Sequence, residues 1–167
     1  GIGSTKGSLS NPPAQVYVLD TAARDHFAAD CPVTAYGQLV DRENKYLLMG
    51  SNQTGYIHRY NLALKKEEGK FKAGTTMYKM ILSSGSKYLY VFNKKSVEVR
   101  SWPSMNALST IPLSKVFPGV TVLLVSEAVH ATDDGKYAVF GLLKKAPNGP
   151  WWSSDRQDGF HLLSLGD

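Results

Sequence analysis

Short apolar runs alternate with polar turns along most of the chain, and three of these units align with one another. Each unit is a polar turn, a Lys-Tyr pair and a run of apolar residues, and the pairs begin at Lys45, Lys87 and Lys136. The first two lysines are 42 residues apart and the last two are 49 apart. A recurrence of about 40 to 50 residues is typical of repeats that each form one small four-stranded sheet. The pattern therefore predicts a repeat protein.

Turn residues and apolar runs predict four strands in the unit around Lys87, and helix signals are nearly absent. Runs such as 88–92 are apolar on both faces, which is typical of a strand covered by other sheets on both sides. We therefore expect an all-β chain, a β-propeller-like stack of about three to four four-stranded antiparallel blades. The predicted strands are 77–82, 87–92, 96–102 and 107–113 in the middle unit, with the turn Asn93-Lys94-Lys95; 33–40, 45–50, 56–62 and 69–73 in the preceding unit; 121–129, 136–143 and 160–165 in the following unit; and 16–20 as one further third strand.

The domain organisation follows from these units. We expect an N-terminal extension or linker over 1–14 and a single propeller segment over 15–167. Closed propellers have at least four blades, so three units and a fraction leave an apolar blade face open. The segment is therefore expected to be part of a larger propeller, whose missing blades come from another chain, a second copy or sequence absent here.

The turn, the Lys-Tyr pair and the apolar strand, followed by Ser96-Val97-Glu98-Val99-Arg100-Ser101-Trp102, resemble blades of the WD-repeat and YVTN-type β-propeller superfamily. The resemblance covers the chain from about Gln15 onward. There is no Gly-His opening pair, and Arg59-Tyr60, Ser101-Trp102 and Leu163-Ser164 stand where a Trp-Asp closing pair would fall. The resemblance implies the propeller fold, and because propellers host scaffolds, lectins and enzymes alike, it assigns no activity.

Composition narrows the classes of function only slightly. Of the 167 residues 43% are hydrophobic, and no run is long and apolar enough to predict a membrane-spanning helix. The net charge is +5, but the lysines are scattered among carboxylates, which gives a mild preference for anionic partners. The single cysteine, Cys31, excludes an internal disulfide and favours a reducing compartment. The sequon Asn52-Gln53-Thr54 would instead fit a secreted chain, so both compartments stay open.

A long connection between the second and third strands of the last unit, 144–159, is the strongest candidate for a ligand site. It contains Trp151, Trp152, Asp155 and Arg156, which could form a stacking platform for sugars or bases with hydrogen-bonding groups beside it. Lys94 and Lys95 are expected at the same end of the propeller, where they would add a basic patch for phosphate or acidic protein. The structural alternatives are a tryptophan that fills the gap between blades and lysines that are simply solvated.

The remaining polar motifs predict no catalytic, metal or cofactor site. His26, His58, His130 and His161 lack metal-ligand spacing, and 133–135 and 83–86 are interpreted as turns. We therefore expect a non-catalytic protein–protein interaction scaffold, in which a protein partner or a second copy covers the open blade face. The alternative is a lectin-like or enzymatic propeller that binds a glycan or anionic ligand on the loops described above.

Overall fold

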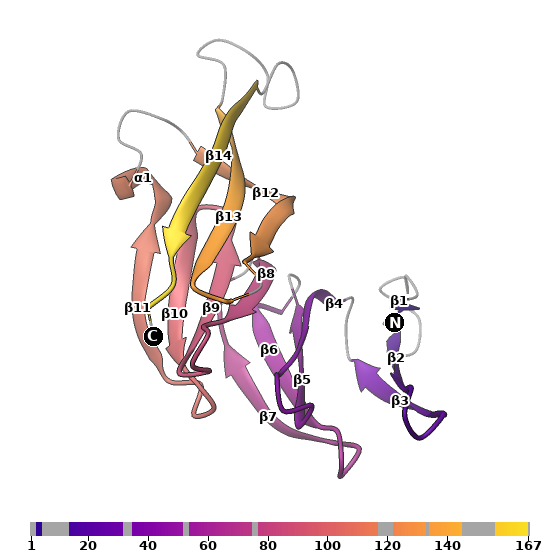
Figure 1. Cartoon of the computed structure of the whole chain (residues 1–167). Helices are drawn as coiled ribbons and strands as arrows, with labels where there is room; N and C mark the ends of the chain where they lie inside the picture. The colour runs from indigo at the N-terminus through magenta and orange to yellow at the C-terminus, as the bar shows by residue number, and fades with distance from the viewer. Residues whose placement is uncertain are drawn as a thin grey trace. The chain divides into compact units, whose positions relative to one another are not determined.

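The computed structural model describes residues 3–4, 14–31, 35–51, 54–74, 77–116, 122–132, 134–144 and 156–166, and most of them are in antiparallel sheets (Figure 1). The sheets follow one another along the chain, and within each sheet consecutive strands pair as a meander. Chain contacts group into two compact units, Gly1–Met77 and Tyr78–Asp167. The all-β prediction is confirmed.

The first unit contains sheets A and B. Sheet A consists of β1 (Gly3–Ser4), β2 (Ala14–Asp20) and β3 (Asp25–Cys31), and sheet B of β4 (Ala35–Val40), β5 (Tyr46–Ser51), β6 (Tyr56–Asn61) and β7 (Lys66–Lys72). Val16 of sheet A packs with Leu47, Met49 and Tyr60 of sheet B, and Val18 and Phe27 add to this core. One face of sheet A is therefore covered by sheet B.

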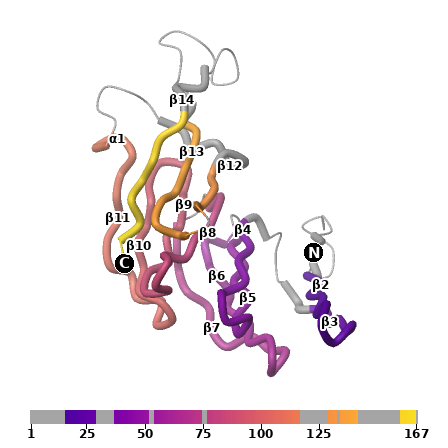
Figure 2. Tube along the Cα trace, in the orientation of Figure 1, coloured from indigo at the N-terminus to yellow at the C-terminus, as the bar shows by residue number. Residues whose placement is uncertain are grey.

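The second unit is built on sheets C and D. Sheet C consists of β8 (Met77–Leu82), β9 (Tyr88–Asn93), β10 (Ser96–Ser101) and β11 (Ala107–Pro112); α1 (Leu113–Val116) follows; and sheet D consists of β12 (Val122–Ala131), β13 (Tyr137–Lys144) and β14 (Arg156–Ser164). Tyr90, Phe92 and Val97 of sheet C pack against Phe140 of sheet D and Leu165 just beyond it. The rings of Phe92 and Phe140 are 6.1 Å apart between centroids. Sheet D has the strand order β12-β13-β14, and Figure 2 shows the coloured parts of β13 and β14 running side by side.

The three repeat lysines have equivalent surroundings. Each lies directly before the second strand of its sheet, and its backbone carbonyl accepts a hydrogen bond from the residue just after the third strand. The bonds run from Leu62 N–H to Lys45 (2.9 Å), from Trp102 N–H to Lys87 (2.7 Å) and from Leu165 N–H to Lys136 (2.7 Å). The alignment read from the sequence therefore corresponds to a repeated three-dimensional unit.

The polar turn before each lysine is also repeated. Asp41, Ser83 and Thr132 each use a side-chain oxygen to accept the backbone N–H of the tyrosine after the lysine, at 2.8, 3.2 and 3.1 Å. Asn44, Ser86 and Gly135, which precede the lysines, have φ angles of 53, 51 and 67°. This left-handed conformation favours glycine and asparagine, which explains part of the turn composition.

Several boundaries differ from the predicted ones. β3 was not predicted, β7 begins at Lys66 instead of 69, and β14 begins at Arg156 instead of 160. These stretches are rich in charged or small polar side chains, and most β7 side chains are exposed. Outer strands are held by backbone pairing, so the apolar pattern does not reveal them. Leu113, expected at the end of a strand, begins α1. No helix in the described part of the chain is long and apolar enough to cross a membrane.

Candidate interaction surface

Sheet D has one covered face and one open face. Successive side chains of a strand point to opposite faces. Leu163 of β14 packs into the core shared with sheet C. Phe160 and Leu162 lie on the opposite face, and each of them is 70% exposed. Tyr137 of β13 is on the same face, because it pairs with Ser164, and is 44% exposed.

The open face of sheet D corresponds to the face of sheet C that is buried. In sheet C, Val97 pairs with Phe92 and Val99 pairs with Tyr90. At the equivalent positions relative to the repeat lysine, sheet D has Phe160, which pairs with Gly141, and Leu162, which pairs with Val139. Val97 is 0% exposed, and Val99 packs against the same core. We call the face of a sheet that corresponds to this packed face of sheet C its forward face, and the opposite face its backward face. In sheets A and C the forward face packs on the next sheet along the chain.

The hairpins of sheets A and B are also equivalent, which assigns the faces of sheet A. Asp20 Oδ1 accepts the N–H groups of Ala22 and Ala23, both at 2.9 Å. Asn61 Oδ1 accepts the N–H of Leu64 at 3.0 Å in the corresponding turn. Both turns join two strands with the same four-residue length, so residues of β2 and β6 can be matched by counting back from Asp20 and Asn61.

The backward face of sheet A, which points away from sheet B, is open. Tyr17 and Leu19 of β2 lie on it and are 44% and 53% exposed. The residues at the matching places of β6 are His58 and Tyr60, which are 2% and 5% exposed. The described residues therefore expose two blade faces of opposite kind: a backward face on sheet A and a forward face on sheet D.

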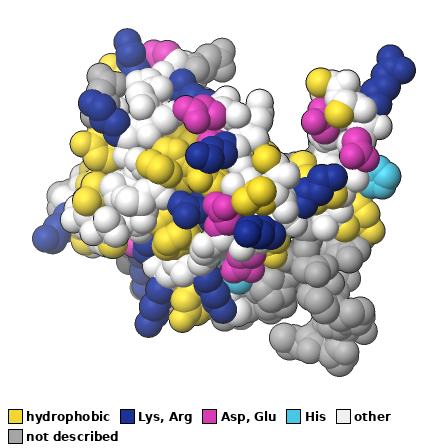
Figure 3. Space-filling model, turned by 90° about the horizontal axis from the view of Figure 1, so that it is seen from below, with side chains coloured by type: hydrophobic (Ala, Val, Ile, Leu, Met, Phe, Trp, Pro, Cys, Tyr) yellow, Lys and Arg dark blue, Asp and Glu magenta, His cyan; other side chains and the backbone are white. Residues whose placement is uncertain are grey.

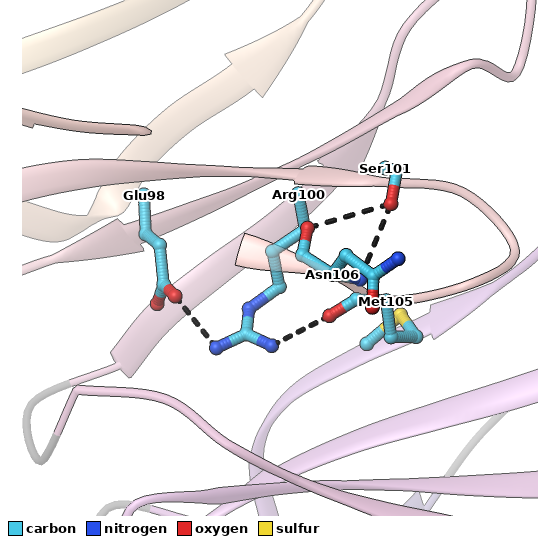
Figure 4. Close-up of polar contacts among 5 residues, drawn as sticks. All are labelled: Glu98, Arg100, Ser101, Met105 and Asn106. Atoms are coloured by element: carbon cyan, nitrogen blue, oxygen red, sulfur yellow. Dashed lines mark hydrogen bonds and ion pairs between the residues drawn. The ribbon is translucent and has the colours of Figure 1, made fainter. Parts of the chain in front are cut away.

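The buried Arg100 side chain has two partners close to it in the chain. Figure 4 shows the Arg100 guanidinium between the Glu98 carboxylate and the backbone carbonyl of Met105. Arg100 donates to Glu98 at 2.6 Å and to Met105 at 2.8 Å. The side chains of Arg100 and Glu98 are 6% and 12% exposed. This arrangement stabilises the connection between β10 and β11.

Histidines and carboxylates do not assemble a metal centre in the part of the chain that the structure describes. His58 Nδ1 lies 3.1 Å from Glu67 Oε1, and the Tyr60 hydroxyl donates to Glu67 Oε2 at 3.4 Å. His58 Nε2 is buried without a hydrogen-bond partner. One imidazole and one carboxylate are too few ligands for a closed zinc site.

The Asp-Gly turn of the last repeat has the geometry expected of a turn. Thr132 donates its hydroxyl proton to Asp134 Oδ1 at 2.6 Å, and Lys136 donates its backbone N–H at 3.0 Å. These bonds, with the Thr132 hydroxyl first, lower the pKa of the Asp134 carboxyl. Its oxygens thereby stabilise the chain reversal. Asp133 lies outside the described residues.

The residues predicted to form a ligand site fall partly outside the described chain. Trp151, Trp152 and Asp155 lie outside it. Arg156 is the first residue of β14, paired with Lys144, and is not part of a loop. Lys94 and Lys95 form the β9–β10 turn as expected, with Lys94 half-buried and Lys95 exposed. The stacking platform and the basic patch stay predictions.

Charge is mixed on the face of the molecule drawn in Figure 3, where Lys and Arg side chains alternate with Asp and Glu. This agrees with the scattered lysines of the sequence. An open apolar blade face was expected from the number of blades, but the sequence did not identify which residues form it. Phe160 and Leu162 show the same apolar alternation as Val97 and Val99. Only the exposed fractions distinguish the open face from the buried one.

Comparisons with known proteins agree on the fold. No family model matches the chain, and no curated protein matches it. Hydrazine synthase from Kuenenia stuttgartiensis is similar in structure, with a TM-score of 0.63 and 15% identity over 90% of this chain and 43% of that one. A putative 6-phosphogluconolactonase from Bacteroides uniformis ATCC 8492 has a TM-score of 0.55 and 12% identity over 95% of this chain and 53% of that one.

Both of these solved structures are propeller-type folds, and identities of 15% and 12% show a common fold alone. The chain is therefore a β-propeller-like protein built from successive antiparallel blades. The blade-level resemblance is confirmed, without assignment to the WD-repeat family. The chain spans about half the length of the two solved chains, 43% and 53%.

Proposed function

We propose that the chain is a non-catalytic protein–protein interaction module and a segment of a larger propeller or complex. The observation that carries this proposal is the exposure of Phe160 and Leu162, each 70%, at the places where sheet C has the packed Val97 and Val99. Exposed apolar patches with a defined shape mark interaction surfaces.

The energy of the exposed side chains supports the same conclusion. Covering a Phe or Leu side chain fully stabilises an assembly by about 1.5 to 3 kcal/mol. Burying Phe160 and Leu162 on sheet D, or Tyr17 and Leu19 on sheet A, would therefore stabilise a complex by several kcal/mol of binding free energy. A partner that covers either face gains this free energy. Two buried polar side chains, Arg100 and His58, contact the carboxylates of Glu98 and Glu67 within their own sheets and so serve the packing of the blades.

The test is recovery of partners from the native cells after chemical crosslinking. We expect the unmodified protein to crosslink to the same proteins as a control variant, Leu64→Ser with Leu108→Ser, whose leucines are 57% and 53% exposed outside both open faces. The variant Phe160→Ser with Leu162→Ser should no longer crosslink to these proteins, while its circular dichroism spectrum stays the same as that of the unmodified protein. An identical set of crosslinked proteins in all three samples would contradict the proposal.

A further inference from the structure

We infer that the outer edge of β14 binds an extended polypeptide strand, which adds to sheet D as its fourth strand. The inference rests on the proposed interaction function and names the kind of partner. Sheets B and C each have four strands, and in both of them the fourth strand pairs with the third. In the part of the chain that the structure describes, sheet D consists of β12, β13 and β14, so β14 lies at an edge. The backbone groups along a sheet edge are a template for a further strand.

Every second backbone N–H of β14 points to this outer edge. Leu165, just after β14, donates its N–H to the carbonyl of Lys136 on the β13 side, at 2.7 Å. Successive N–H groups of a strand point in opposite directions. The N–H groups of Phe160, Leu162 and Ser164 therefore point away from β13.

Sheet C shows the same edge in its paired form. Ser101 of β10 pairs with the tyrosine after its repeat lysine, as Ser164 of β14 does, so the two serines are equivalent. The N–H of Ser101 donates to the carbonyl of Asn106, just before β11, at 2.9 Å. The N–H of Ser164 is aimed where a corresponding fourth strand would begin.

The two existing fourth strands define the register of the strand that β14 would bind. Both β7 and β11 run antiparallel to the third strand of their sheet, and both pairings shift register at one place. The shift falls at 59–60 in sheet B and at 99–100 in sheet C. These places are equivalent in the repeat and correspond to 162–163 in sheet D. A strand on β14 is therefore expected to bulge there as well.

The side chains of β7 and β11 define what kind of strand fits. Both strands have a small residue followed two positions later by an apolar one: Gly69 and Phe71 in β7, and Ser109 and Ile111 in β11. The small residue lies opposite the equivalent of Leu162, and the apolar residue lies opposite the equivalent of Phe160. The residue between them is polar, Lys70 or Thr110. The partner is therefore an extended strand with the order small, polar, apolar.

The small residue makes room for the apolar side chain. A Cβ atom added at Gly69 would lie 2.7 Å from Cζ of Phe71, so the ring of Phe71 lies over Gly69. The ring thereby reaches the third strand, where the Arg59 guanidinium lies 5.2 Å from its centroid. In sheet C, Ile111 packs against the core of its unit. On sheet D, the same apolar side chain would cover Leu162, which is 70% exposed.

The test adds a synthetic peptide with the sequence 106–113 to the 167-residue chain and maps amide hydrogen exchange along β14 by NMR. This peptide contains β11, whose partner strand β10 presents apolar residues as β14 does. We expect the N–H groups of Phe160, Leu162 and Ser164 to exchange quickly without the peptide and slowly with it. Slow exchange before the peptide is added would show a closed edge and overturn the inference. Unchanged exchange in its presence would overturn it too.

Two N-methylated peptides separate edge pairing from unspecific apolar binding. Leu113 donates its N–H to the carbonyl of Lys95 at 2.9 Å, so the N–H of Ile111, two residues earlier, also faces β10, and that of Thr110 faces away. The peptide methylated on the Ile111 nitrogen should have a dissociation constant at least about tenfold higher than the peptide methylated on the Thr110 nitrogen, because it lacks a hydrogen bond to the edge. Equal dissociation constants would contradict pairing at the edge.

A third peptide, Thr110→Ile with Ile111→Thr, tests the residue order at constant composition. It moves the apolar side chain to the face of the strand that is turned away from Phe160 and Leu162. Its dissociation constant should therefore be at least about tenfold higher than that of the unmodified peptide. An unchanged value would contradict the order small, polar, apolar.

These outcomes separate the inference from the proposed function. If the peptide leaves β14 unprotected and Phe160→Ser with Leu162→Ser still loses its crosslinked proteins, the strand is wrong and the interaction function stands. If the peptide protects β14 and that variant keeps all crosslinked proteins, the edge binds a strand and the function proposed for the open face is wrong. If neither measurement changes, both are wrong.

Discussion

The backbone N–H of Gly166 donates a hydrogen bond of 2.8 Å to the hydroxyl of Tyr90, which lies 76 residues earlier in the chain. Tyr90 is on β9 of sheet C, and Gly166 follows β14 of sheet D. The bond adds a directional contact to the apolar packing of the two sheets. Tyr90 itself is 5% exposed.

Tyr90→Phe should lower the free energy of unfolding at neutral pH by about 1 kcal/mol, since it removes this hydrogen bond and leaves the amide of Gly166 without it. Urea unfolding measures the change. Tyr137→Phe is the matched control, because Tyr137 is 44% exposed on the opposite face of sheet D. Equal effects of the two substitutions would show that the bond to Gly166 contributes nothing.

The same residue should make stability depend on alkaline pH. Burial raises the pKa of Tyr90, against the opposing effect of the Gly166 N–H. The unfolded chain therefore releases this proton at a lower pH than the folded chain, and stability falls as the pH rises above about 10. In Tyr90→Phe the decline over this range should be smaller than in the unmodified protein. An unchanged slope would show that another group causes the alkaline loss.

Arg100→Met should be strongly destabilising, because it leaves the buried Glu98 carboxylate and the Met105 carbonyl without their shared donor. Breaking a buried ion pair from one side costs about 3 to 5 kcal/mol. The double variant Glu98→Gln with Arg100→Met should recover part of the loss. Chemical denaturation of Arg100→Met, Glu98→Gln and the double variant measures the coupling energy between the two side chains.

An exposed ion pair serves as the comparison for Arg100. Lys65 and Asp25 are 3.6 Å apart, with side chains 53% and 64% exposed. Lys65→Met should cost less than about 1 kcal/mol. A cost as large as that of Arg100→Met would contradict the role of burial.

Asp41→Ala should destabilise sheet B by about 1 to 2 kcal/mol, since the Asp41 carboxylate accepts the N–H groups of Lys45 and Tyr46 at 2.7 and 2.8 Å. Glu43→Ala, an exposed change in the same turn, should have little effect. Thermal unfolding followed by circular dichroism compares the two. An unchanged melting temperature in Asp41→Ala would show that the turn is held by its backbone bonds alone.

The alternative hypothesis of a lectin-like loop gives a separate prediction. If Trp151 and Trp152 form a stacking platform, a glycan array should detect binding that Trp151→Ala and Trp152→Ala abolish, because each substitution removes an aromatic ring on which a sugar would pack. Lys94→Ala with Lys95→Ala should weaken binding of anionic glycans only. Absence of any glycan bound by the unmodified protein would contradict the hypothesis.

The sequence by itself determined the repeat, the all-β class and most strand positions, because turn chemistry and apolar alternation are local properties. Lys45, Lys87 and Lys136 could be aligned from their neighbours alone, although the third strand follows Lys136 much later than it follows the other two. Strands with polar outer residues, such as β3 and the first part of β14, carried no such local signal.

Only the tertiary structure decided which apolar faces are covered. Val99 and Leu162 belong to equivalent strands with the same alternation, yet one packs against a neighbouring sheet and the other is open to solvent. Burial depends on which sheet lies against a residue, and the residue's own strand does not specify that neighbour. The candidate interaction surface is therefore set by which sheets lie against one another in three dimensions.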